Sequence, residues 1–149
     1  MSFAARPATL ADVDDILTMM EDFNAIEAIS FDRAAFAPRV RSLVGDRTVG
    51  GLILFTVDGA VAGYAVVTWG WDLEFAGRDA FLTELYVVAA RRGQGVGRAG
   101  LAAAEAFAHA GGANALHLLV RPENAPARRL YDASGWKTQP RLIMTKLLG

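Results

Sequence analysis

Apolar residues recur at helical spacing in the first third of the chain. A helix is predicted directly after Thr9–Asp12, which has the pattern of a helix capping box, with these residues on its core face: Val13, Ile16, Leu17 and Met20. Residues 3–6 before it are predicted to form a short strand. A second helix, with a weaker apolar stripe, is predicted from Asp32 to about Val44.

The middle of the chain has the pattern of three consecutive antiparallel strands. An apolar run over residues 51–57 ends at Asp58-Gly59, a dipeptide that favours the positive φ angles of a tight hairpin turn. The return strand is predicted from Ala60 to about Trp71. Residues 72–79 are polar and contain a glycine, so they are predicted to turn the chain into a third strand, Ala80 to Val88.

Helices and strands alternate in the last third. An alanine-rich helix is predicted from Val96 to about Ala110, and a strand over residues 115–120 is predicted to run parallel to the strand before the helix. Residues 124–134 are predicted to form another helix, and residues 142–148 a last strand that closes the sheet. The predicted fold class is therefore α/β (α+β), a mixed sheet with helices on its faces.

The composition narrows the class of protein. A chain of 149 residues can bury one sizeable core, so a single domain over residues 1–149 is predicted. Hydrophobic residues make up 53% of the chain, which excludes an intrinsically disordered protein. The absence of cysteine excludes disulfides and an acyl-cysteine intermediate. His109 and His117 lack metal-ligand spacing, so no metal site is expected.

The charge and hydropathy patterns indicate a small-molecule partner. With 15 basic and 16 acidic residues the net charge is -1, which gives no reason to expect nucleic acid as the main partner. No apolar stretch approaches the roughly 20 residues that cross a bilayer, and residues 1–6 lack the apolar region of a secretory signal. We therefore expect a cytoplasmic location and no association with membranes.

The strongest functional signal is a glycine-rich turn between a strand and a helix: Leu85-Tyr86-Val87-Val88-Ala89-Ala90-Arg91-Arg92-Gly93-Gln94-Gly95-Val96-Gly97-Arg98. Backbone amides at such a helix start have no intrahelical partners, and glycine lets the chain wrap an anion closely. The arginines add positive charge. A tight turn alone would explain one glycine, but three at alternate positions beside arginines predict a pyrophosphate site.

Other phosphate-binding loops fit the sequence less well. The Walker pattern is absent. Residues 95–100 do match G-x-G-x-x-G, and Glu123 stands near where a ribose-binding acid is expected. However, the turn follows an antiparallel meander, and the 49 residues after Gly100 are too few for the parallel strands of a full dinucleotide fold.

In this region the sequence resembles the GCN5-related N-acetyltransferase (GNAT) family. Residues 92–97 satisfy the family's pyrophosphate motif R/Q-x-x-G-x-G/A, and residues 124–131 followed by Gly135-Trp136 are similar to its N-x-x-A-x-x-x-Y and G-F signature. Residues 6–9 with the acidic helix after them are also similar. The resemblance covers nearly the whole chain, and the two motifs together are far more specific than either alone.

The resemblance implies acetyl-CoA (coenzyme A) as the cofactor and a mostly antiparallel sheet in which a splayed parallel strand pair admits the pantetheine arm. Relatives also imply a homodimer. Asn124 and Tyr131 stand about two helical turns apart, so they can share one helix side. The implied cofactor-binding residues are Leu85, Tyr86, Val87, Arg92, Gly93, Gln94, Gly95, Val96, Gly97, Arg98, Asn124, Ala127 and Tyr131.

Attack of an amine on a thioester needs a neutral amine, a polarised carbonyl and a proton for the departing thiolate. The resemblance implies that Tyr131 supplies this proton and that the amide of Val87 polarises the carbonyl; a core aromatic is the alternative for Tyr131. The general base stays open. Leu119 occupies the place of a fifth-strand carboxylate in some relatives, whereas Glu84 is a fourth-strand candidate. Strand alternation makes a structural or solvent-facing Glu84 an equally good interpretation.

Acidic and aromatic residues in the first-helix region and in the connection between the third and fourth strands suit a cationic amine acceptor. The substrate-binding candidates are Phe23, Asn24, Glu27, Trp69 and Trp71. The alternative proton acceptors are Asp22, Glu27, Asp72, Glu74 or a chain of waters. Each of these residues alone is also an ordinary surface or packing residue.

Two other functions compete with catalysis of amine acetylation. A non-catalytic acyl-CoA binding or sensing module would keep the cofactor site, and the missing carboxylate at Leu119 leaves this alternative open. A nucleotide-dependent enzyme of the dinucleotide type is the third hypothesis, already disfavoured by the predicted topology.

Overall fold

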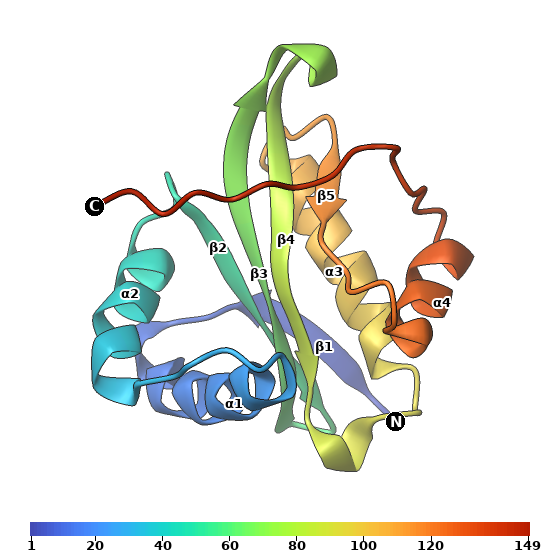
Figure 1. The fold of residues 1–149 in the computed structure, drawn as a ribbon. Coiled ribbons are helices and arrows are strands. Elements are labelled where there is room, and N and C mark those ends of the chain that lie inside the picture. Colours follow the sequence, from blue (N-terminus) through green and yellow to red (C-terminus); the bar gives the residue numbers. More distant parts are fainter. The chain divides into compact units, whose positions relative to one another are not determined.

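The computed structural model describes residues 1–149 as two compact units, Met1–Leu119 and Val120–Gly149, and each is described by itself. The first unit contains a five-stranded sheet in which the strands lie in sequence order (Figure 1). Its strands are β1 (Phe3–Pro7), β2 (Gly50–Val57), β3 (Ala60–Asp72), β4 (Gly77–Val87) and β5 (Leu116–Leu118). β1 to β4 are antiparallel and β5 joins β4 in parallel, which confirms the predicted mixed sheet.

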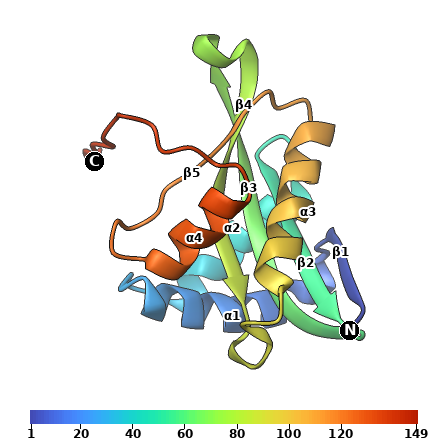
Figure 2. The ribbon, with the colours of Figure 1, turned by 90° about the vertical axis from the view of Figure 1, so that its right-hand side faces the viewer.

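Helices cover both faces of this sheet (Figure 2). α1 (Val13–Ile26) and α2 (Arg33–Gly45) lie on one face, and α3 (Val96–Ala110) lies on the other. The apolar stripe predicted for α1 packs on strand residues such as Leu54 and Tyr64, which are fully buried. None of the four α-helices combines the length and the hydropathy that crossing a bilayer requires.

The predicted capping box is present at the start of the first helical segment. Asp12 accepts a hydrogen bond from the amide of Thr9 at 2.7 Å, and a 3-10 turn over Leu10–Asp12 leads into α1. Both carboxylate oxygens of Asp12 also bind the Arg6 guanidinium, at 2.7 and 2.9 Å. The hydrogen bonds from Arg6 and Thr9 hold the pKa of Asp12 well below its usual value. These contacts fix where the chain leaves β1 and α1 begins.

The hairpin between β3 and β4 is tighter than the sequence predicts. We predicted a turn over residues 72–79, but β4 already begins at Gly77. Asp79 is buried and its carboxylate lies 3.0 Å from Nε2 of His117 in β5, while the guanidinium of Arg78 lies over the ring of Trp69. The partners of Arg78 and Asp79 come from distant parts of the chain. The sequence around these two polar residues therefore resembles a turn, although both residues lie in a strand.

The strand predicted over residues 142–148 is not formed. These residues have no regular secondary structure, and the side chains of Leu142 and Met144 are 93% and 92% exposed. A strand is stable only when its backbone groups pair with a neighbour, and a run of consecutive apolar residues lacks the alternation that would fix its register. The prediction of a sixth strand is therefore wrong.

The second unit contains α4 (Ala125–Ala133) and no strand. Asn124 caps the helix, because its Oδ1 accepts a hydrogen bond from the amide of Ala127 at 3.2 Å. Gly135, with φ of 88°, turns the chain after the helix, and the amide of Trp136 then donates to the carbonyl of Tyr131 at 3.0 Å. The helix predicted over residues 124–134 is confirmed, with its two end residues acting as caps.

Replacing Gly100 with alanine should lower the free energy of unfolding by about 1–2 kcal/mol, although alanine is the better helix former. The reason is that a Cβ on Gly100 would lie 2.4 Å from Cε2 of Phe55 in β2. Urea denaturation would measure the change. The exposed Ala102→Gly provides the control, because it should lose about 1 kcal/mol from helix propensity alone. A more stable Gly100→Ala variant would contradict the tight packing of α3 on β2.

Candidate functional site

The parallel strand pair separates at a β-bulge in β4. Val66 of β3 pairs with Glu84, whereas Val67 pairs with Leu82, so Thr83 is an extra residue in β4. β5 pairs with β4 only over Ala80–Leu82, directly before the bulge. Beyond it, residues 84–87 of β4 keep β3 as a partner and have no strand on their other edge. This edge can therefore pair with an extended ligand, except at the carbonyl of Val87, which already accepts a hydrogen bond from Arg92.

The glycine-rich turn follows this unpaired edge and leads into α3. Gly93 and Gly95 have φ angles of 74° and 84°, which other residues rarely adopt. No atom lies within 4 Å of the Cβ position of either glycine, so the space above them is open. The amide of Ala99 makes the first bond of the helix, to the carbonyl of Gly95, and the amides of residues 96–98 therefore lack acceptors within α3. An anion with several oxygens fits this arrangement.

Arg92 at the start of the turn is bound by the protein itself. Its Nε donates to the carbonyl oxygen of Val87 at 2.9 Å, and a terminal nitrogen lies 3.3 Å from Oδ2 of Asp22 in α1. The same Oδ2 accepts a hydrogen bond from the hydroxyl of Tyr86 at 2.6 Å. The end of β4, the turn and α1 are thus joined at one carboxylate.

Glu84 points to the face of the sheet that carries α1 and α2. Its Oε1 accepts a hydrogen bond from the hydroxyl of Tyr64 at 2.7 Å. The ring of Tyr64 stacks on that of Tyr86 and meets the ring of Phe23 edge-on. Burial raises the pKa of Glu84, although the hydrogen bond from Tyr64 acts in the opposite direction. The carboxyl group is therefore held in place and exchanges its proton nearer to neutral pH than an exposed glutamate does.

The structure separates the substrate-binding candidates into two groups. Phe23, Asn24 and Glu27 lie in or directly after the C-terminal half of α1, on the Glu84 side of the sheet. Asn24 is buried, and its Nδ2 donates to the carbonyl of Met20. Trp69 packs on the opposite face, where its ring stacks on Phe107 of α3 with centroids 5.5 Å apart.

Trp71 lies two residues further along β3, close to the tip of the hairpin, and is 75% exposed. Side chains two residues apart on a strand share a face, so Trp71 belongs with Trp69. Neither tryptophan therefore lies on the face of the sheet that carries Glu84. Asp72 caps the 3-10 turn Leu73–Phe75 at this tip by accepting from the amide of Glu74 at 2.9 Å.

Tyr131 and the cap residues belong to the second unit. The ring of Tyr131 lies 6.0 Å from that of Trp136, so the residues of the second family motif form one local structure. Asn124 precedes the first turn of α4 and uses its side-chain oxygen to cap it. The N-x-x-A spacing thus matches a helix cap, in which Asn124 stands directly before α4.

Several residues that shape the site were not anticipated from the sequence. Three features depend on contacts between strands: the bulge at Thr83, the Tyr64 partner of Glu84, and the contact of buried Asp79 with the partly exposed His117. Leu119, at the place of the missing carboxylate, directly follows β5 and is 64% exposed. No local pattern marks a bulge in this strand, and hydrogen bonds between distant residues leave no signal in a single sequence.

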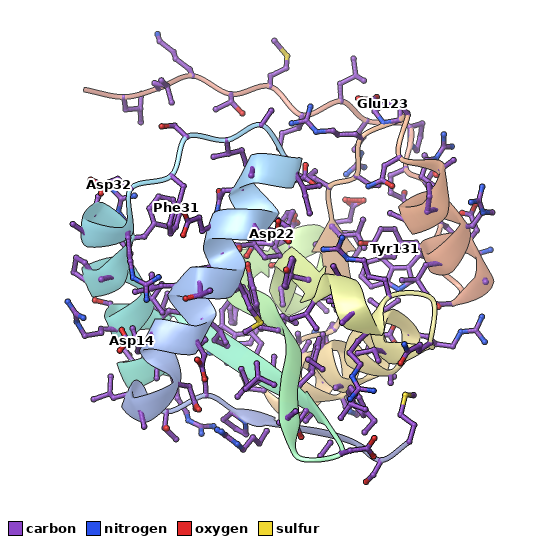
Figure 3. The ribbon with its side chains drawn as sticks, turned by 90° about the horizontal axis from the view of Figure 1, so that it is seen from below. Asp14, Asp22, Phe31, Asp32, Glu123 and Tyr131 are labelled. Atoms are coloured by element: carbon purple, nitrogen blue, oxygen red, sulfur yellow. The ribbon has the colours of Figure 1, made fainter.

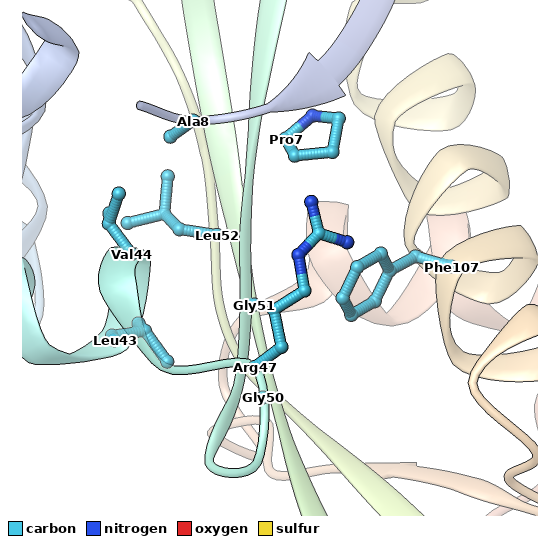
Figure 4. Close-up of a pocket in the computed structure, with 9 residues that line it drawn as sticks. All are labelled: Pro7, Ala8, Leu43, Val44, Arg47, Gly50, Gly51, Leu52 and Phe107. Carbon is cyan, nitrogen blue, oxygen red and sulfur yellow. The ribbon is translucent and has the colours of Figure 1, made fainter. Parts of the chain in front are cut away.

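A small cavity lies elsewhere in the first unit, between α2, β2 and α3 (Figure 4). Its volume is about 20 Å³, enough for a single water. Its lining residues are Pro7, Ala8, Leu43, Val44, Arg47, Gly50, Gly51, Leu52 and Phe107. The cavity is too small for a substrate.

Comparisons with known proteins agree with this geometry. The model of the acetyltransferase (GNAT) family matches residues 16–136. A solved structure from Arthrobacter sp. FB24, provisionally assigned as an acetyltransferase, is 30% identical, with a TM-score of 0.82 over 97% of this chain and 96% of that one. The search of curated proteins gave no match.

Two more distant structures share the fold. An integron cassette protein from the mobile metagenome of Cole Harbour Salt Marsh is 23% identical, with a TM-score of 0.86 over 97% of this chain and 90% of that one. An aminoglycoside N-acetyltransferase in complex with CoA is 16% identical, with a TM-score of 0.83 over 98% and 95% of the two chains. The fold is thus that of acetyltransferases, and this chain belongs to the acetyltransferase (GNAT) family.

Proposed function

We propose that this protein is an acetyl-CoA-dependent N-acetyltransferase that transfers an acetyl group directly from the thioester to a primary amine of a small molecule or protein. The observation that carries the proposal is the continuity of the unpaired edge of β4 with the open glycine turn at the start of α3. The amides of an extended ligand match the unpaired strand edge, and a pyrophosphate at the end of that ligand matches the glycine turn.

The residues proposed to hold acetyl-CoA follow from this match. The backbone of Leu85–Val87 would pair with the pantetheine amides, in the manner of a neighbouring strand. The amides of residues 93–98 would bind the pyrophosphate, and Arg98, exposed in the first turn of α3, would add positive charge. Asn124 and Ala127 are assigned to the cofactor by the family motif. The bound cofactor supplies an activated acyl carbonyl.

Three groups of the chain are proposed to promote the transfer. The amide of Val87 polarises the acyl carbonyl, and Glu84 takes a proton from the acceptor ammonium, directly or through water. Its contact with Tyr64 and its raised pKa support this role. Tyr131 gives a proton to the departing thiolate, a role that rests on the family motif.

The acceptor is proposed to approach from the α1 side of the sheet. Phe23 contacts Tyr64, the partner of Glu84, and Asn24 and Glu27 follow on the same helix. An aromatic ring and a carboxylate suit a cationic amine. The aminoglycoside substrate named for one structural neighbour belongs to this chemical class. Trp69 and Trp71 remain candidates only for parts of a larger acceptor that reach the β3–β4 hairpin.

Release of free thiol from acetyl-CoA in the presence of a panel of amines tests this function. We expect thiol release with at least one primary amine and none without an acceptor. Binding of acetyl-CoA without turnover of any amine would instead support the sensing module, for which Leu119 in place of a carboxylate is the specific observation. Protection from thermal unfolding by NAD and not by acetyl-CoA would support the dinucleotide alternative.

A further inference from the structure

Arg92 is the first residue of the glycine turn, but its side chain contacts other groups of the protein. Two of its nitrogens bind the Val87 carbonyl and the Asp22 carboxylate, and the centre of its guanidinium lies 5.5 Å from the centre of the Tyr86 ring. These contacts are made by Nε, by one terminal nitrogen, and by the guanidinium as a cation above the ring. The orientation of the guanidinium is therefore fixed before any phosphate binds.

Asp22 connects this arginine to the sheet and to α1. Its Oδ2 accepts from both Arg92 and the hydroxyl of Tyr86. Burial and the Asp22 acceptor raise the pKa of Tyr86 to about 12, so its hydroxyl remains a donor at neutral pH. Figure 3 shows Asp22 on α1, and Phe23 and Asn24 directly follow it in the chain. The carboxylate therefore ties the helix of the acceptor-side candidates to the end of β4.

We propose that Arg92 and Asp22 form a bridge that positions the end of β4 for acyl transfer, and that the Arg92 side chain is not a phosphate ligand. The proposal rests on the proposed function. Because Nε holds the carbonyl of Val87, the bridge fixes the peptide planes at the strand end, where the acyl group is proposed to bind. Arg92 and Asp22 are both about half exposed, so their ion pair alone would contribute little to stability.

Kinetics of the full-length protein with acetyl-CoA and its best amine test the bridge. Arg92→Gln and Asp22→Asn should each lower kcat about tenfold, with the KM for acetyl-CoA changed less than about twofold. The double variant should be no slower than the slower single one, because both changes break the same bridge. Arg92→Lys should not restore kcat, since an ammonium cannot make the same set of contacts.

Binding of 3′-phospho-ADP, the half of the cofactor that lacks pantetheine, separates positioning from phosphate binding. Arg92→Gln should leave its Kd within about twofold, whereas the control Arg98→Gln should weaken binding. Equal weakening by both variants would overturn the proposal. Restoration of kcat by Arg92→Lys or an unchanged kcat in Asp22→Asn would also overturn it. A loss of kcat in Asp22→Asn far beyond that in Arg92→Gln would overturn it too, because it would mark Asp22 as the base.

The bridge can also be judged if the proposed function fails. If the unsubstituted protein acetylates no amine, the affinity for 3′-phospho-ADP and a double-mutant cycle in urea unfolding still apply. Coupling between Asp22→Asn and Arg92→Gln, with unchanged 3′-phospho-ADP binding, would support the bridge in a protein without turnover. Weakening of 3′-phospho-ADP binding by Arg92→Gln as large as that by Arg98→Gln would overturn it.

Discussion

Replacing Tyr131 with phenylalanine should lower kcat about 100- to 10,000-fold and leave the KM for acetyl-CoA nearly unchanged. The substitution removes only the hydroxyl that is proposed to protonate the departing thiolate. The ring, which lies beside that of Trp136 in the second unit, is retained. Steady-state kinetics at saturating amine would measure the effect.

The leaving group provides the control for this prediction. An acyl-CoA analogue whose leaving group is more acidic than the thiol of coenzyme A needs less help from an acid, so Tyr131→Phe should lose less activity with it. An unchanged kcat in a folded Tyr131→Phe variant would show that Tyr131 is the packed aromatic of the alternative interpretation. The far-ultraviolet circular dichroism spectrum should be the same for both proteins.

Replacing Glu84 with glutamine should lower kcat about 100-fold at neutral pH, because the amide cannot take the proton of the acceptor ammonium. Glutamine has nearly the same shape and can still accept the hydrogen bond from Tyr64. Lost packing would therefore contribute little to the decrease in kcat. Recovery of the rate at high pH, where the amine itself is neutral, is the expected signature of a missing base.

The pH profile gives an independent check on Glu84. The pKa of this carboxyl is raised by burial and lowered by the hydrogen bond from Tyr64. Removing the hydroxyl with Tyr64→Phe should therefore raise the pKa further and move the acid limb of kcat/KM to higher pH. An acid limb that is the same in Tyr64→Phe and in the unsubstituted protein would leave Glu84 a structural acid.

Local patterns made much of this fold predictable from the sequence. The capping box Thr9–Asp12, the Asp58-Gly59 hairpin and the glycine turn depend on residues close together in the chain. A glycine inside a helical pattern costs stability and so indicates a close contact; at Gly100 the ring of Phe55 lies against the helix. Such features can be recognised because the residue types and their spacing determine the geometry.

The parts that could not be predicted depend on contacts between distant residues. Alternation along β4 left open whether Glu84 faces solvent, and only its Tyr64 partner, 20 residues away, resolves how the carboxyl group is held. Asp22 and Arg92 are 70 residues apart, and Asp22 lies outside the motif that contains Arg92. The apolar residues 142–148 suggested a strand, but hydropathy alone does not supply a pairing partner.

Isothermal titration calorimetry of the full-length protein with acetyl-CoA tests the central claim most directly. We expect saturable binding to one site with a Kd between about 1 μM and 1 mM. Gly95→Val should weaken this binding at least tenfold, because φ at this position is 84° and a branched side chain cannot adopt it without strain. No heat of binding from the folded protein with millimolar acetyl-CoA would contradict an acyl-CoA site at the glycine turn.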